Sequence, residues 1–225
     1  MKPVSILTLR RLSQYLERVL EAKKEGKANI SATTLANLTG VHRTQVRKDL
    51  AVTGVVGVPK VGHKVDDLVV SIGDFLNWND TTEAFLVGAG NLGSALLGFH
   101  MSFADKGLNI LAAFDNDPAK AGTEVHGIPV YPLDKFSDLA KRLHIHIGIL
   151  AVPPLVAQQV TNMMLEAGVL AVWNFTPAPL TVPEGIIVEN VDLMASLAVL
   201  SHRLSERLQP DRNRRNDDRS TSSEP

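Results

Sequence analysis

The sequence predicts an α/β protein in which a small helical part precedes a larger part built on a parallel sheet. Short helical patterns fill the first 75 residues, whereas strand and helix patterns alternate after residue 82. The charge divides at the same place: residues 1–75 hold 12 Lys and Arg against 7 Asp and Glu, and residues 76–208 hold 7 against 13. The net charge of −1 therefore averages over a basic part of +5, which indicates an anionic partner such as nucleic acid.

Three helices are expected in the first 50 residues. Apolar residues recur at three- and four-residue intervals from Ser5 to Glu25, and the glycine that follows supplies a stop. Ser31 can cap a second, brief helix that Gly40 ends. A third helix begins near His42, so a short glycine-containing turn separates it from the second, as in a helix-turn-helix motif.

The segment after the third helix predicts a wing. β-branched residues lie on both sides of a Gly/Pro turn in residues 52–65, a pattern typical of a two-stranded hairpin. Asp66 is expected to cap a short apolar helix, and the polar residues 77–82 are expected to form a linker. We therefore expect a winged helix-turn-helix DNA-binding domain over residues 1–76.

The third helix has the composition of a recognition helix. With Val46 and Leu50 turned toward the core, a rotation of ~100° per residue places a polar set on the opposite face. That set, with one residue at its margin, is Arg43, Thr44, Arg47 and Lys48. Arginine can read guanine edges, lysine and threonine can engage phosphates, and Lys60 in the wing could reach the backbone or the minor groove. The alternative is a solvated charged face on a small helical subdomain.

A glycine motif after the first expected strand, 84–87, predicts a dinucleotide site. Its residues are Gly88, Ala89, Gly90, Asn91, Leu92 and Gly93. The first glycine allows a tight turn, the second lets the backbone approach a pyrophosphate, and the third lets helix and strand pack closely. The N-terminus of the following helix offers free N–H groups to the phosphates. The alternative is a glycine-rich turn without a cofactor.

The second expected strand of this domain ends in a carboxylate. Asp115 lies 22 residues after Gly93, where an acid is expected to bind the hydroxyls of the adenosine ribose. Asn116 and Asp117 follow, with no Arg to receive a 2′-phosphate. The sequence therefore favours NAD over NADP.

The alternation of strands and helices predicts a Rossmann-type parallel sheet. Strands are expected at 84–87, 110–114, 144–152, 169–175 and 185–188, and helices at 91–105, 134–143, 154–167 and 191–208. The dinucleotide-binding domain is placed at 83–190, with the last helix, 191–208, separate from it. The tail 209–225 is rich in Arg, Asp, Asn and Ser and is expected to be disordered.

Several classes of protein are excluded by what the chain lacks. There is no Cys, which rules out disulfides, thiolate metal sites and a redox-sensing thiol. No histidines have metal-ligand spacing and no catalytic acid–base pair is evident, so neither a metal nor catalysis is expected. No signal-peptide core and no run near ~18 apolar residues is present, so a soluble, cytoplasmic protein is expected.

Six segments in this order give the chain a specific resemblance. They are Gly40-Val41 with Gln45-Val46-Arg47-Lys48-Asp49-Leu50, the stretch from Gly88 to Leu96, Phe114-Asp115-Asn116-Asp117-Pro118, Ala151-Val152-Pro153, Asn174-Phe175-Thr176-Pro177, and Glu189-Asn190-Val191-Asp192-Leu193. Up to about residue 208, the chain resembles the Rex family of redox-sensing transcriptional repressors. That resemblance implies an N-terminal winged helix, a Rossmann domain and a C-terminal helix that swaps between the subunits of a homodimer. It also implies that NADH releases operator DNA, that NAD+ permits binding, and that the operator is palindromic.

The resemblance also assigns roles to residues. It implies DNA contacts by Arg47 and Lys48. We expect the DNA-binding residues to include these two together with Arg43, Thr44 and Gln45 of the third helix and Lys60 and His63 of the wing. It implies an adenosine-pyrophosphate site at the glycine motif and Asp115. Residues near the nicotinamide would be Val152, Pro153, Asn174, Phe175 and Thr176, because such sheets bind ligands past their strand ends.

The chain departs from the family pattern in the wing and in the contacts implied for coupling. His63 stands where the family has Tyr, and residues 51–53 replace a Ser-Tyr-Phe stretch. Phe99 stands where a Tyr usually bonds the swapped-helix carboxylate, here Asp192, and Glu17 occupies a position that is usually basic. We therefore expect coupling between cofactor and DNA to involve Glu17, Phe99 and Asp192 without two of the usual contacts.

Other functions remain open at this point. The chain could be an NAD-dependent oxidoreductase or a CoA-binding, ligase-type Rossmann protein with a fused helical module. It could also be a sensor that acts through a protein partner.

Overall fold

The computed structural model describes the backbone of residues 4–220 and the side chains of residues 4–208. It divides into two compact units, and each has its own hydrophobic core. Of the described residues, the first unit holds 4–83 and 98–110, and the second holds 84–97 and 111–220. Among the described residues, no helix is long and apolar enough to cross a membrane.

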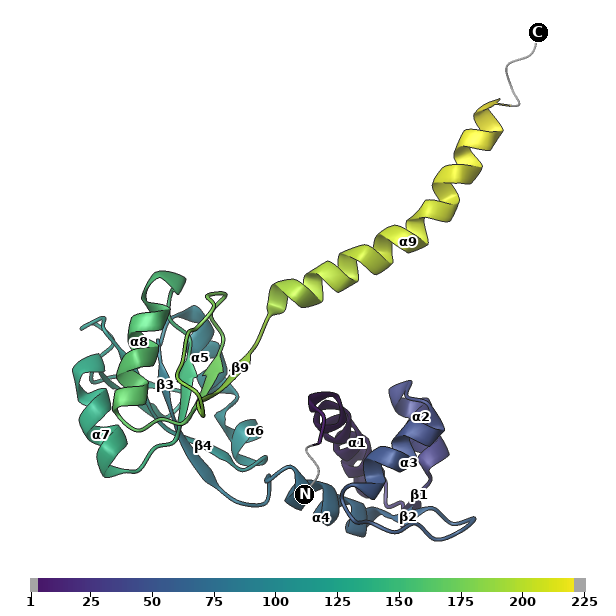
Figure 1. The fold of residues 1–225 in the computed structure, drawn as a ribbon, viewed down its shortest axis with the longest axis horizontal. Helices are drawn as coiled ribbons and strands as arrows, with labels where there is room; N and C mark the ends of the chain where they lie inside the picture. The colour runs from purple at the N-terminus through teal and green to yellow at the C-terminus, as the bar shows by residue number, and fades with distance from the viewer. Residues whose placement is uncertain (1–3, 221–225) are drawn as a thin grey trace. The chain divides into compact units, whose positions relative to one another are not determined.

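Four helices make up most of the first unit (Figure 1). They are α1 (Ile6–Lys24), α2 (Ala32–Thr39), α3 (Arg43–Ala51) and α4 (Val65–Phe75). Ser5 caps α1 by accepting a hydrogen bond from the N–H of Thr8, and Ser31 caps α2 by accepting one from Thr34. Gly40 ends α2 with a φ of 68°, a left-handed conformation that glycine adopts without strain. The three helices predicted for this part are confirmed.

The predicted two-stranded wing is wrong in its pairing. Residues 58–62 form a turn closed by an isolated bridge between Val58 and Gly62, and β2 (His63–Lys64) pairs instead with β1 (Asn29–Ile30). Pro59 has no N–H to donate to a neighbouring strand, and Lys60 has a left-handed φ of 66°. Neither residue can therefore continue a ladder of hydrogen bonds between two strands. A Cβ on Gly62 would lie 2.5 Å from the carbonyl oxygen of Ile30, so only glycine lets β2 approach β1 here.

The helix expected after the wing is present, but Asp66 is not its cap. The N-cap of α4 is Lys64, which makes no side-chain capping bond, and Asp66 lies in the first turn with Asp67. Both carboxylates are favourable there because the N-terminus of a helix carries partial positive charge.

A seven-stranded sheet has the order β5-β6-β4-β3-β7-β8-β9. The strands are β3 (Thr82–Val87), β4 (Leu108–Asp115), β5 (Glu124–Val125), β6 (Ile128–Pro132), β7 (Ile147–Leu150), β8 (Ala171–Asn174) and β9 (Ile187–Asn190). The pairs β3–β7, β7–β8, β8–β9 and β4–β6 are parallel, and β5 is antiparallel to β6. The sequence patterns missed β5 and β6, because β5 has two residues and β6 contains Pro129 and Pro132, which argue against a strand.

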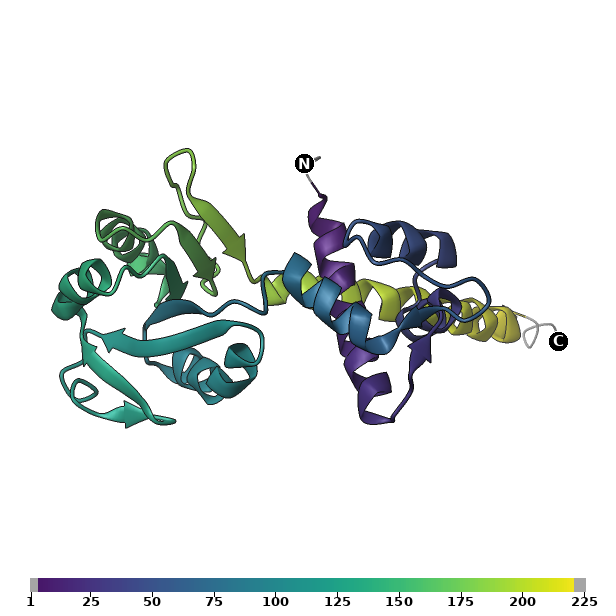
Figure 2. The ribbon, with the colours of Figure 1, turned by 90° about the horizontal axis from the view of Figure 1, so that it is seen from below.

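The remaining helices are α5 (Asn91–Gly98), α6 (His100–Ala104), α7 (Phe136–Arg142), α8 (Pro154–Glu166) and α9 (Leu193–Ser220), with a 3₁₀ turn at Leu133–Lys135. Figure 2 shows α7 and α8 on one side of the strands and α5 on the other. Phe136 of α7 and Met164 of α8 are fully buried against the strands.

Two predicted helix boundaries are corrected. The helix expected at 91–105 is two helices, because Phe99 between them has a φ of −95° and a ψ of 5°. The last helix was expected to end at residue 208 with a disordered tail beyond it, but helical backbone continues to Ser220. A polar composition does not by itself prevent a helix, since the hydrogen bonds that form one are backbone bonds. Residues 221–225 of the predicted tail lie outside the described residues.

Candidate functional site

Helix α3 presents the polar face that its periodicity predicts. Val46 and Leu50 are buried in the core of the first unit, with 0% and 1% exposure. The side chains exposed on the other face are Arg43, Thr44, Arg47 and Lys48. Among the described residues, none of the three cations in this set forms an ion pair, so their donors are available to an anionic ligand.

A groove of about 650 Å³ runs beside α3. Arg47 lines one side of it and the wing segment 55–63 lines another, with Lys60 at the wing turn. Thr33 of α2 also contributes. The structure therefore brings the predicted residues Arg47, Lys60 and His63 to one groove.

His63 enters this groove as a neutral side chain. Burial lowers the pKa of its imidazole, and the positive charge of Arg47 lowers it further. A Cβ on Gly57 would lie 2.7 Å from Nε2 of His63, so the ring rests against the backbone of the wing. Nδ1 is buried and has no hydrogen-bond partner within the described part of the chain. His63 therefore shapes the groove and does not supply a cation at neutral pH.

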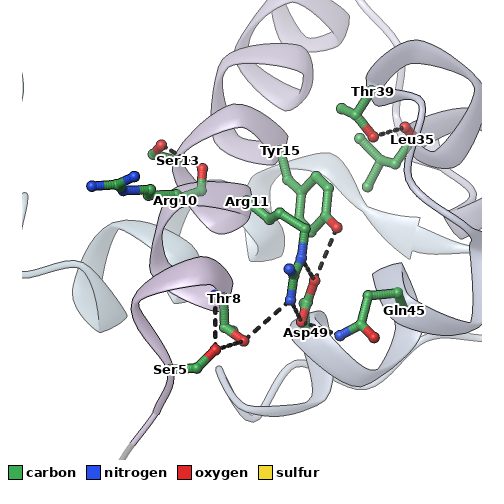
Figure 3. Close-up of polar contacts among 10 residues, drawn as sticks. All are labelled: Ser5, Thr8, Arg10, Arg11, Ser13, Tyr15, Leu35, Thr39, Gln45 and Asp49. Carbon is green, nitrogen blue, oxygen red and sulfur yellow. Dashed lines mark hydrogen bonds and ion pairs between the residues drawn. The ribbon is translucent and has the colours of Figure 1, made fainter. Parts of the chain in front are cut away.

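A buried carboxylate ties α3 to α1 (Figure 3). Asp49, 2% exposed, accepts hydrogen bonds from Arg11 Nε at 2.6 Å and Arg11 Nη2 at 2.9 Å. The hydroxyl of Tyr15 donates to it at 3.0 Å and the amide of Gln45 at 2.8 Å. Gln45 was predicted to face DNA, but its side chain is half-buried and bonded to Asp49.

The pKa values in this cluster follow from its geometry. Burial favours the neutral form of Asp49, but the hydrogen bonds from Arg11, Gln45 and Tyr15 outweigh it and lower the pKa of the carboxyl. The hydrogen bond to Asp49 raises the pKa of Arg11. Burial raises the pKa of the Tyr15 hydroxyl, and its hydrogen bond to Asp49 adds to the shift. The cluster is therefore a charged, fully bonded anchor between the two helices.

The glycine motif of the second unit forms a cradle between β3 and α5. Gly88 has a φ of 99°, and a Cβ there would lie 2.5 Å from the carbonyl oxygen of Ala151. A Cβ on Gly93 would lie 1.8 Å from the carbonyl oxygen of Gly88, so only glycine allows this packing of helix on loop. Gly90 faces open space, with nothing within 4 Å of the place a Cβ would take. Asn91 and Leu92, at the start of α5, are exposed.

Asp115 sits at the end of β4 beside this cradle. Its Oδ2 accepts the N–H of Ala89 at 2.8 Å and its Oδ1 accepts the N–H of Asp117 at 2.9 Å. The ammonium of Lys120 lies 3.0 Å from Oδ2. Burial opposes ionisation of Asp115, but the Asp117 N–H, Lys120 and the Ala89 N–H together lower its pKa. Asp115 is therefore a carboxylate, and its bond to Ala89 holds the glycine loop.

A cavity of about 570 Å³ opens over these residues. Its lining includes Gly88, Gly90, Asp115, Asn116, Lys120, Val152, Pro153, Val156 and Met163. Ligand sites in proteins span ~300–1,000 Å³ and combine apolar walls with a few polar groups, as this one does. The open Gly90 backbone, the carboxylate and the cavity together fit a dinucleotide that lies across the carboxyl ends of the strands.

Three residues predicted near the nicotinamide lie outside this lining. Asn174 is fully buried, and its amide donates to Asn190 Oδ1 at 2.8 Å and to the carbonyl of Ala178 at 3.2 Å. Its Oδ1 accepts from both the N–H and the hydroxyl of Thr176, itself 5% exposed. The ring of Phe175 packs on Trp173 at 4.9 Å. Asn174 and Thr176 therefore hold the loop after β8 in place, with their polar atoms engaged inside the protein.

The residues expected to couple cofactor binding to DNA binding belong to different units of the chain. Glu17 lies 3.8 Å from Lys106, and Phe99, 59% exposed, packs against Phe103 at 6.5 Å between ring centroids. Both belong to the first unit. Asp192 belongs to the second unit and accepts a hydrogen bond from the N–H of Ala195 in the first turn of α9.

The sequence patterns did not predict two pairs of interacting residues. Lys120 reaches Asp115 from five residues away, and no motif in the sequence indicates that pairing. The Arg11–Asp49 pair joins residues 38 apart in different helices, although Asp49 on the apolar side of α3 is a signal that a partner exists. Among the described residues, no group of His, Asp or Glu side chains could hold a metal ion.

Two family models match the chain. The family "Putative DNA-binding protein N-terminus" matches residues 3–51, and the CoA binding domain matches residues 79–178. Curated relatives cover far more of the chain. A redox-sensing transcriptional repressor Rex from Treponema denticola is 42% identical over 86% of this chain and 91% of its own. The Rex of Bacteroides fragilis is 41% identical over 88% of this chain and 90% of its own.

Solved structures agree with these relatives. RSP, a Rex-family repressor, is 32% identical, covers 95% of this chain and 100% of its own, and has a TM-score of 0.84. Its complex with NAD+ and operator DNA has a TM-score of 0.85 at 33% identity, with 95% of this chain and 98% of its own covered. Its complex with NADH has a TM-score of 0.84 at 32% identity, with 94% and 99% covered.

These matches confirm the predicted fold class, an N-terminal DNA-binding region followed by a Rossmann-type sheet and a C-terminal helix. They also confirm the resemblance drawn from the sequence segments. This chain belongs to the Rex family of redox-sensing transcriptional repressors.

Proposed function

We propose that this chain is a DNA-binding transcriptional repressor that senses the NADH/NAD+ ratio, and that NADH releases it from its operator. One observation carries the proposal: the chain joins a helix with exposed cations to a glycine-cradled cavity that fits a dinucleotide. RSP, which is similar over nearly its whole length, has been solved both with NAD+ and operator DNA and with NADH.

In this proposal α3 reads the operator. Arg43 and Arg47 are exposed and can each donate a bidentate pair to guanine. Lys48 and Thr44 contact phosphates from the same face, and Lys60 contacts the backbone from the wing turn. His63 contributes by shape, and Gln45 acts through Asp49, which fixes the helix that carries the others.

The second unit binds the cofactor through the cradle. The backbone at Gly88–Gly93 binds the pyrophosphate and Asp115 accepts a ribose hydroxyl. Val152 and Pro153 line the cavity on the nicotinamide side, with the loop of Phe175 held by Asn174 and Thr176. Bound NADH and NAD+ differ in the charge of the nicotinamide ring, and that difference is the redox signal.

The repressor acts as a homodimer in this proposal. Helix α9 exposes apolar side chains along the part whose side chains are described, namely Leu193, Met194, Leu197, Val199, Leu200, Leu204 and Leu208. A swapped α9 would bury this surface against a second copy, and two recognition helices would then match a palindromic operator. Contacts of Asp192 with the surroundings of Glu17 and Phe99 would couple the two functions. A coupling of ~1–3 kcal/mol is sufficient for regulation.

The remaining assignments complete the proposal. The DNA-binding domain is 1–76, the linker 77–82 and the dinucleotide-binding domain 83–190. The dimerisation segment 191–208 holds the first part of α9, whose helical backbone continues into the segment 209–225 as far as Ser220. The protein works in the cytoplasm on chromosomal DNA and needs no metal. It has no catalytic activity in this proposal, in line with the relatives it is similar to, which are named transcriptional repressors. An oxidoreductase or a CoA-binding enzyme is the alternative, because the CoA binding domain matches residues 79–178.

Selection from a library of random duplexes tests the DNA-binding part of this proposal. The full-length chain with NAD+ is expected to enrich sequences with two-fold symmetry, and Arg47→Ala is expected to enrich the same sequences much less strongly. Arg142→Ala is a matched control, since Arg142 is exposed on α7 in the second unit. Failure of the wild-type chain to enrich any sequence would contradict the repressor, whereas oxidation of bound NADH by a metabolite would favour the enzyme.

A further inference from the structure

We propose that Lys120 determines how the nucleotide site discriminates between a ribose 2′-hydroxyl and a ribose 2′-phosphate, and that it lets the site accept NADPH to a measurable degree. The inference rests on the proposed function, because it concerns the same cavity. Lys120 lines that cavity with Asp115 and Asn116. Its side chain is 36% exposed, so it is reachable by a ligand.

The carboxylate oxygens of Asp115 are already partly occupied by hydrogen bonds. Each carboxylate oxygen accepts about two hydrogen bonds. Oδ2 already accepts the Ala89 N–H and the Lys120 ammonium, whereas, among the residues that the structure describes, Oδ1 accepts the Asp117 N–H alone. Asp115 therefore has room for one ribose hydroxyl while Lys120 stays in place, and for a second only when Lys120 leaves.

Lys120 also changes the charge beside the ribose. A bare carboxylate beside the ribose repels a 2′-phosphate, which is why an acid at this position selects NAD. Here the Lys120 ammonium lies 3.0 Å from Asp115 and 3.9 Å from Asp117, so it offsets the negative charge of both. An ammonium has three donors on a flexible stem, so Lys120 can turn a donor toward a phosphate at the cavity mouth.

These two effects give opposite expectations for the two nucleotides. Lys120→Met removes the cation and frees Oδ2 of Asp115, so NADH affinity is retained or rises. The same change leaves the Asp115 carboxylate beside the 2′-phosphate without the cation that offsets its charge, so NADPH affinity falls by about tenfold or more. Lys120→Arg keeps the cation and is expected to keep NADPH binding.

The test is titration of NADH and of NADPH into the full-length chain at fixed ionic strength, followed by nucleotide fluorescence. The wild type, Lys120→Met, Lys120→Arg and Lys141→Met are compared. Lys141 is a matched control because it is exposed on α7 and is not part of the cavity lining. Binding of NADH by Lys120→Met shows that the variant is folded.

The result expected is a ratio of NADPH to NADH dissociation constants that rises about tenfold in Lys120→Met and stays unchanged in the Arg variant and the control. A ratio that changes less than about twofold in Lys120→Met, with NADH still bound, would overturn the role of Lys120 and leave the proposed function standing. Failure of the wild type to bind either nucleotide would overturn the proposed function and this inference with it.

Discussion

Asp49→Ala is predicted to destabilise the first unit by ~3–5 kcal/mol, as expected when one partner of a buried ion pair is removed. Asp49 is 2% exposed and accepts four hydrogen bonds, two from Arg11 and one each from Tyr15 and Gln45. Without the carboxylate, the Arg11 guanidinium, whose side chain is only 22% exposed, keeps its charge without a partner. The loss is expected near the lower end of the range, because this exposure lets water reach part of the guanidinium.

Urea unfolding of the full-length chain measures this loss. Trp78 packs against the core of the first unit and Trp173 lies in β8, so a Trp173→Phe background leaves fluorescence that reports on the first unit. Tyr15→Phe in the same background is expected to lose about 1 kcal/mol, since Asp49 keeps its other donors. Asp66→Ala is the control, because its ion pair with Lys23 is exposed and such pairs contribute ~0–1 kcal/mol.

Two outcomes would refute the reasoning. If Asp49→Ala loses no more stability than Asp66→Ala, the buried carboxylate is not the anchor between α1 and α3. If Arg11→Ala and Asp49→Ala have additive effects in the double variant, the two side chains do not act as a pair, since residues in contact are expected to couple.

Three further predictions follow from the two sites. Arg47→Ala is expected to weaken operator binding by ~1–3 kcal/mol in a mobility-shift titration with NADH affinity unchanged; a loss of both would contradict the assignment of Arg47 to the DNA face alone. Asn174→Ala is expected to destabilise the second unit by about 2 kcal/mol, because Thr176 and Asn190 lose buried partners; unfolding followed by Trp173 checks this, and a wild-type midpoint would argue against it. The pKa values of Asp49 and Asp115 are lowered by folding, so their contribution is present above their unfolded pKa near ~3.9 and is lost as the pH falls through the folded values. Unfolding free energies measured from pH 6 to pH 3 should therefore fall toward acid, and less steeply in Asp49→Ala; equal slopes would contradict the linkage.

Local patterns predicted much of the DNA face. The spacing of Val46 and Leu50 identified the buried side of α3, and the exposed positions of Arg43, Arg47 and Lys48 agree with it. The same periodicity could not show that Gln45 is held by Asp49, because that contact depends on the side chains of α1 packed beside α3. Periodicity specifies a face, but it does not specify which polar residue at the edge of that face is bonded internally.

The dinucleotide site was predicted where a motif fixes backbone geometry. A Cβ on Gly88 or on Gly93 would clash with a backbone carbonyl oxygen, so only glycine fits at either position. This steric requirement is why a glycine pattern is informative there. Lys120 and β6 escaped prediction because neither depends on a local pattern. The pairing of Lys120 with Asp115 needs the turn after β4, and β6 is stabilised by parallel pairing with β4 despite its prolines.

The wing and the end of the last helix show a different limit. β-branched residues at 52–65 favour extended backbone, but the partner of β2 is β1, more than 30 residues earlier in the chain. A pairing across that distance leaves no local signal. The charged composition after residue 208 predicts disorder because it offers no apolar face for packing. The helical backbone of α9 nevertheless continues to Ser220.

The most direct test of the central claim is anisotropy of a labelled operator duplex bound to the full-length chain, with NADH titrated at fixed salt in the presence of NAD+. Salt must be fixed because phosphate contacts make DNA affinity depend on it. NADH is expected to weaken operator binding by ~5–150-fold at saturation, and Asp115→Ala is expected to shift the NADH midpoint upward without changing operator affinity in NAD+. Operator binding that is the same at every NADH concentration would contradict the account.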